Sequence, residues 1–166
     1  MISELHNHHV NIELQDVINY ITTSDKDLII EVIDAQGFKK PESYLYDDNG
    51  YPLSAKILSY YELGYTMIIS NVGRHFEEVK EVEKIVGNYW SNFYFGKGCV
   101  GVSPSFPYHN HDYDVVVKNI FGSSVWRVDG EIVNLQDQDV LELPKGTFHQ
   151  VTDIEKLKLS LTCNLL

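Results

Sequence analysis

Cysteine is scarce in this sequence of 166 residues, and the apolar runs typical of membrane spans and secretion signals are missing from it. Cys99 and Cys163 form no Cys-x-x-Cys motif, so we expect buried free thiols rather than a disulfide framework. No apolar run approaches the roughly 20 residues that span a bilayer. The first residues also lack the basic region and apolar run of a secretion signal. We therefore expect a cytoplasmic protein with no membrane partner.

Positive charge is also in short supply. The chain has 13 Lys and Arg against 24 Asp and Glu, which gives a net charge of −11. Because phosphate binding depends on clustered Lys and Arg, this balance argues against nucleic acid as a partner. Repeats, low-complexity tracts and Pro/Gly-rich linkers are absent too. With 43% apolar residues to build a core, the sequence predicts one domain over residues 1–166.

The part of the chain from 1 to about 88 mixes helical and strand signals. Apolar residues recur at helical spacing in 14–21 and 74–87, and a further helix is predicted for 55–63, with Ser54 as its cap. Buried strands are predicted for 27–33 and 65–70. This part is expected to be a helical and strand lead-in to the second half of the chain.

From about 89 to 166 the sequence is typical of β structure. Short runs rich in Val, Ile, Leu and aromatic residues alternate with turn residues, and Asp129-Gly130 is a strong hairpin signal. The predicted strands are 90–95, 99–103, 114–121, 125–128, 131–135, 140–143 and 157–165. Helices followed by about seven closely spaced strands favour a β-barrel core with a helical layer on one side.

Three histidines stand out in the barrel half. His109 and His111 lie two residues apart, so they share one face if the segment is extended. His149 follows a Pro-x-Gly turn after a predicted strand. Neutral imidazoles are good ligands for a divalent metal, and three on one face leave open coordination positions. By contrast, the N-terminal histidines, His6, His8 and His9, sit in a polar segment and are expected to be solvated.

The stretches His109-x-His111 and Pro144-x-Gly146-x-x-His149 resemble the two signature motifs of the cupin superfamily. The usual Glu of the first motif is missing, and Asp114 is expected to point away from the histidines. The resemblance implies a mainly β fold: a double-stranded β-helix, or cupin/jelly-roll barrel, with a few helices packed on one side. It also implies that His109, His111 and His149 hold a metal ion.

A longer likeness covers most of the chain from about Asp27. The matching segments are 92–94, 109–115, 122–128, 144–149 and 160–161, and they resemble JmjC-type oxygenases, most of all the ribosomal-oxygenase group. That group implies Fe(II), dioxygen and 2-oxoglutarate, used to hydroxylate amino-acid side chains. Asn92, Tyr94 and Asn119 match or adjoin its polar pocket positions and are candidate catalytic residues. Tyr113 and Trp126 are interpreted as packing residues.

The sequence departs from this group at two important positions. His111 occupies the place of the carboxylate metal ligand, and Ser124 stands where a Lys or Arg would bind the far carboxylate of 2-oxoglutarate. Lys158 on the last predicted strand could replace that cation if the polar face of the strand, which includes Asn164, lines the barrel. Ordinary burial preference instead favours solvated lysines. Ser124, Lys158 and Asn164 are thus the candidate cosubstrate-binding positions.

Three functions remain open from the sequence. The first is an Fe(II) oxygenase, with 2-oxoglutarate as cosubstrate and a small-molecule, amino-acid or peptide substrate. The second is a three-His cupin without 2-oxoglutarate: a cosubstrate-free dioxygenase, an isomerase or an epimerase, for which Zn, Ni, Mn or Cu are alternative metals. The third is a non-catalytic ligand-binding cupin. Assembly as a homodimer is also left open.

Overall fold

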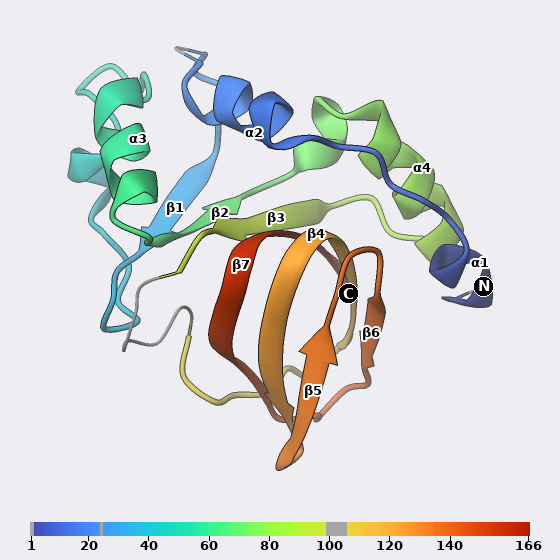
Figure 1. Cartoon of the computed structure of the whole chain (residues 1–166). Helices are drawn as coiled ribbons and strands as arrows, with labels where there is room; N and C mark the ends of the chain where they lie inside the picture. Colours follow the sequence, from blue (N-terminus) through green and yellow to red (C-terminus); the bar gives the residue numbers. More distant parts are fainter. Residues whose placement is uncertain (1, 24, 99–105) are drawn as a thin grey trace.

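Within the part of the chain that the structure describes, seven antiparallel strands form one sheet that curls into a barrel, and the helices lie on the outer side of its first three strands (Figure 1). The computed structural model describes residues 2–23, 25–98 and 106–166. The α-helices are α1 (Ile2–His6), α2 (Leu14–Ile21), α3 (Ser54–Glu62) and α4 (Glu77–Val86), and short 3₁₀ turns span Glu42–Tyr44 and Val72–Arg74. The strands are β1 (Ile30–Ile33), β2 (Thr66–Ile69), β3 (Ser91–Gly96), β4 (Asp114–Val128), β5 (Glu131–Leu135), β6 (Val140–Leu143) and β7 (His149–Leu165).

The last strand, β7, is the centre of the sheet. The strand order is β1-β2-β3-β7-β4-β5, and β6 pairs with β4 beyond this path. Leu161 of β7 lies opposite Phe93 on β3 and Lys118 on β4, so the strand is hydrogen-bonded on both sides. Chain segments that are far apart in sequence therefore meet on β7, which is how the fold can gather one site from several of them.

Two strands are longer than the sequence predicts. The predicted strands 114–121 and 125–128 are one strand, β4, and β7 begins at His149 rather than at residue 157. Pairing between β4 and β7 continues through register shifts that lie between Asn119 and Trp126. Gly122 has φ +83°, and a Cβ there would lie 1.8 Å from the Leu157 carbonyl oxygen, so only glycine fits this close approach. The predicted strand 99–103 lies outside the described residues.

The helical layer has clear sequence determinants. A capping box joins Glu13 and Asp16 at the start of α2, and α4 ends at Gly87, whose φ of +88° gives a left-handed C-cap. The prediction that Ser54 caps α3 is wrong. Ser54 is already the first residue of the helix, and its hydroxyl donates to the Thr23 carbonyl at 3.0 Å. No helix in the described ranges is long and apolar enough to cross a bilayer.

Two apolar clusters fill the domain. The larger one lies between the helices and the sheet and includes Phe93, Leu159 and Leu161. The smaller one lies inside the barrel and comprises Val115, Val117, Trp126, Leu135, Leu143 and Val151. Because the apolar face of β7 joins the larger cluster, its opposite face points into the barrel. The barrel interior therefore has one polar wall, supplied by β7, and one apolar wall.

Candidate metal centre

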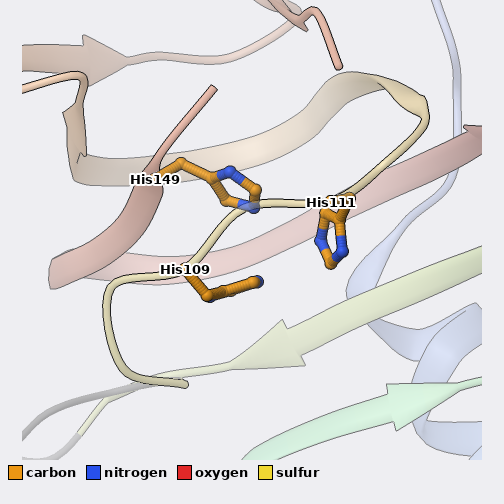
Figure 2. A group of neighbouring side chains, drawn as sticks. All are labelled: His109, His111 and His149. Carbon is orange, nitrogen blue, oxygen red and sulfur yellow. The ribbon is translucent and has the colours of Figure 1, made fainter. Parts of the chain in front are cut away.

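His109, His111 and His149 converge at one end of the barrel (Figure 2). Their ligand atoms all lie within 4.8 Å of one another, and the ring centroids are 4.5 to 5.1 Å apart. A backbone bridge fixes the first and last of them, with His109 N 3.1 Å from His149 O and His149 N 2.8 Å from His109 O. The structure thus brings together the three residues predicted as metal ligands, from two segments nearly 40 positions apart.

The Pro-x-Gly turn before His149 holds the His-x-His segment in place. Gly146 adopts φ +84°, and its amide donates to the His111 carbonyl at 2.9 Å. The Asn110 side chain donates in turn to the Gly146 carbonyl at 3.4 Å. Glycine suits this position because its backbone enters the left-handed region without a steric penalty. The turn therefore positions ligands from both segments at once.

Backbone carbonyls orient two of the imidazoles. His109 Nδ1 lies 2.6 Å from the Pro107 carbonyl oxygen, and His149 Nδ1 lies 3.0 Å from that of Thr147. A carbonyl only accepts, so in each ring Nδ1 carries the hydrogen and Nε2 keeps its lone pair. A hydrogen bond from the ring nitrogen that does not bind the metal to a backbone carbonyl is usual for metal-binding histidines. The donor set thus fits a divalent metal ion.

Burial favours the neutral form of two of these histidines, His111 and His149. It lowers the pKa of His149 and of His111 from the ordinary value, and the neighbouring imidazole of His109 lowers both further. The nearby carboxylate of Asp112 acts in the opposite direction on the pKa of His111. Neutral imidazole is the form that binds metal, so the surroundings favour binding at neutral pH.

No carboxylate joins this cluster within the described ranges. Asp114 Oδ1 accepts a hydrogen bond from the Lys145 amide at 2.7 Å and is not part of the cluster. The N-terminal histidines, His6, His8 and His9, are not part of the cluster either. The third ligand position therefore belongs to His111.

A cavity extends from the histidines into the barrel. Its walls combine apolar residues of the inner cluster with the polar face of β7. The residues that line it besides the three histidines are Tyr94, Phe106, Tyr113, Val115, Val117, Trp126, Leu143, Gln150, Val151, Lys158, Ser160, Thr162 and Asn164. Tyr113 stacks on His111 with centroids 4.9 Å apart, so it is part of the site rather than a distant packing residue.

The predicted catalytic residues are separated by the structure. Tyr94 lines the cavity, and burial raises the pKa of its phenol to about 12. Asn92 does not line the cavity, and its Oδ1 accepts from the Asn71 backbone amide at 3.1 Å. Asn119 is fully buried outside the cavity lining, and its amide donates to the Gly122 and Gln136 carbonyls at 2.8 Å. A catalytic role for these three stays a prediction, and only Tyr94 is placed to touch a ligand.

The predicted cosubstrate positions also separate. Asn164 and Lys158 line the cavity. Ser124 is buried and does not line it; its hydroxyl accepts from Trp126 Nε1 at 2.9 Å. The expectation of solvated lysines is wrong for Lys158, which is only 4% exposed. The alternation of polar and apolar residues along β7 suggested that only the apolar face is buried. In the structure both faces of β7 are covered, one by the larger apolar cluster and one by the barrel interior.

Sequence reasoning missed Phe106, Gln150 and the contribution of Trp126 to the cavity wall. Phe106 meets His109 edge-on at 6.2 Å, and the Trp126 ring lies 6.3 Å from His149. Gln150 directly follows a ligand and lines the cavity. The sequence signal available was proximity to the histidines, but proximity alone does not say which side chains face inward.

Comparison with solved structures shows the fold. YcfD, a ribosomal oxygenase from Escherichia coli, matches with a TM-score of 0.65 and 15% identity, over 95% of this chain and 44% of that chain. Its complexes with cobalt and 2-oxoglutarate and with cobalt and succinic acid match with the same TM-score, at 14% and 15% identity, each over 95% of this chain and 45% of that chain. The chain therefore has a cupin/JmjC-type fold and spans less than half the length of YcfD. No protein-family model and no curated protein matches it significantly.

Proposed function

We propose that this protein is an Fe(II)-dependent oxygenase that uses 2-oxoglutarate and dioxygen to hydroxylate an amino-acid, peptide or other small-molecule substrate. The observation that carries the proposal is the convergence of three imidazoles at the end of a lined cavity. Three protein ligands leave coordination positions open, which is typical of catalytic rather than structural metal sites. A cytoplasmic location is part of the proposal.

The residues of the chain have distinct tasks in this function. His109, His111 and His149 hold the metal, and the Pro107 and Thr147 carbonyls fix the orientation of two of the rings. When bound, ferrous iron supplies the redox chemistry by which one oxygen atom of dioxygen enters the substrate and the other enters succinate, with release of carbon dioxide. The apolar wall of the barrel limits access of water to that chemistry.

The neighbouring fold supports this choice of cosubstrate. Solved structures of YcfD contain cobalt together with 2-oxoglutarate or with succinic acid. A chain with the same fold and a metal-binding cluster is a reasonable candidate for the same class of ligand. A three-His set with no carboxylate in the described cluster favours one other function, a metal-dependent cupin that works without 2-oxoglutarate.

Oxygen consumption tests the proposal. Protein purified without a His tag is loaded anaerobically with Fe(II), then supplied with 2-oxoglutarate and air while dissolved oxygen and succinate are measured. We expect succinate to form in proportion to oxygen consumed, and His149→Ala to abolish both. Oxygen uptake that does not depend on 2-oxoglutarate would select the cosubstrate-free function. Wild-type protein that retains no metal would refute both and leave a binding module.

A further inference from the structure

Lys158 is a buried cation that has no ionic partner among the described residues. It lies in the cavity wall on β7, and its ammonium is 5.3 Å from the centroid of the Trp126 ring. No carboxylate and no hydrogen-bond acceptor pairs with it among the backbone and side-chain groups that the structure describes. A second buried lysine is different, because Lys118 donates to the Leu5 carbonyl at 3.1 Å and to the Gln138 carbonyl at 2.8 Å.

A buried ammonium without an anionic partner is unfavourable on its own. Burial lowers the pKa of Lys158 to about 8, and its ammonium lies over the ring of Trp126, a member of the inner cluster. Native proteins seldom bury a charge that nothing compensates, and such groups concentrate at ligand sites. None of the described side chains supplies the compensating charge for Lys158, so a bound anion is expected to supply it.

The alternative position for a cation is closed. Ser124 is 1% exposed, and its hydroxyl accepts from Trp126 Nε1 at 2.9 Å. That hydrogen bond holds the indole whose ring faces the Lys158 ammonium. Ser124 thus positions the Trp126 ring that lies against Lys158, and Ser124 itself does not line the cavity.

The neighbouring Ser160 on the same wall is less available to a ligand. The Ser160 hydroxyl donates to Asn119 Oδ1 at 2.9 Å, and the Asn119 amide is held by two carbonyls. Ser160 therefore cannot donate to a ligand without breaking this network. Lys158 is the charged donor that the wall offers to an anion in the cavity.

We infer that Lys158 binds the far carboxylate of a short dicarboxylate ligand whose other end lies toward His109, His111 and His149. This inference rests on the proposed function for the identity of the ligand, 2-oxoglutarate. It assigns the anion-binding position to β7, whereas the resembling oxygenases place their cation at the β4 position that Ser124 occupies here. The ammonium and the three imidazoles border the same cavity, which is what a ligand with two anionic ends requires.

Calorimetric titration of the zinc-loaded protein tests the inference without any turnover. The two probes are 2-oxoglutarate and 2-oxobutyrate, which shares the 2-oxo acid end and lacks the far carboxylate. Charge-assisted hydrogen bonds of this kind correspond to about ten- to a hundred-fold in affinity. We expect wild type to prefer 2-oxoglutarate by at least that factor, and Lys158→Met to lose most of this preference. Lys84→Met, which removes an exposed lysine of α4, is the matched control and should keep the preference.

The outcomes separate the two proposals. Equal binding of both probes by wild type, or an unchanged preference in Lys158→Met, overturns the role of Lys158. A preference that is mostly lost in Lys158→Met supports it even if the iron protein consumes no oxygen, in which case only the proposed function fails. Thermal unfolding of the metal-free proteins adds a second measurement. Removing an unpaired cation should leave Lys158→Met at least as stable as wild type, whereas a lysine with a purely structural role predicts a lower melting temperature.

Discussion

Acidification should release the metal with an unusually steep dependence on pH. Each imidazole must be neutral to bind, and an unperturbed imidazole has a pKa of about 6.5. Burial lowers the pKa of His149 and His111, so both are largely neutral at pH 7 and compete little with the metal there. As pH falls through the folded-state pKa values, protons occupy the ligands and affinity drops. Metal affinity should therefore be lost as the pH falls below neutral and not as it rises above neutral.

The number of ligands sets the slope. When all three imidazoles take up a proton as the metal ion leaves, metal affinity falls by up to about a thousandfold per pH unit. This corresponds to roughly 4 kcal/mol of binding free energy. A site with two imidazoles and one carboxylate would admit only two protons until the pH approaches about 4. His111→Asp creates that site at the same position and is the natural comparison.

Zinc affinity measured by chelator competition between about pH 5 and 7.5 distinguishes the two kinds of site. The expected result is a limiting slope near three for wild type and near two for His111→Asp, with zinc retained to lower pH in the variant. Far-ultraviolet circular dichroism at each pH confirms that the protein is still folded. A wild-type slope of two or less, or identical curves for the two proteins, would refute the three-imidazole site.

Three further outcomes are expected. His149→Ala should abolish stoichiometric zinc binding measured by elemental analysis, whereas His8→Ala should leave it intact, because only the former belongs to the cluster. Ser124→Lys should not tighten binding of 2-oxoglutarate; it places a long cation in a buried position that holds Trp126, and urea unfolding should show a loss of about 1–3 kcal/mol. The free energy of unfolding of the metal-free protein, measured by urea titration, should rise from about pH 8 to 9.5. In this range the folded state has lost the proton of Lys158, whereas the unfolded state still keeps it. Lys158→Met should flatten this rise.

Much of the fold followed from local sequence signals. The hairpin at Asp129-Gly130 forms as predicted, with φ values of +46° and +83°, and strands β5 and β6 have the predicted bounds. The lengths of β4 and β7 did not follow. Polar and glycine residues between 119 and 124 look like a break in sequence, yet pairing with β7 carries the strand through register shifts. Tertiary pairing of this kind leaves no periodic signal.

The cluster of three histidines could be predicted because its sequence signal is local. A His-x-His pair and a Pro-x-Gly turn before His149 fix spacing and direction within a few residues of chain. Lys158 could not be settled in the same way, because its exposure depends on which layers cover β7. The strand is sandwiched between the helical layer and the barrel interior, and that is a property of the whole topology.

The two departures from the resembling oxygenases should act together rather than independently. With His111 in place of a carboxylate, a bound divalent metal keeps its full double charge and attracts a dianionic ligand more strongly. Lys158 adds a further positive charge from the wall of the same cavity. His111→Asp therefore installs the usual ligand of the family but removes one unit of positive charge from the site. We expect it to weaken 2-oxoglutarate binding to the zinc-loaded protein, measured by calorimetry, while 2-oxobutyrate, with one negative charge fewer, loses less affinity. Equal losses for the two ligands would show that the charge at the metal does not determine dianion binding here.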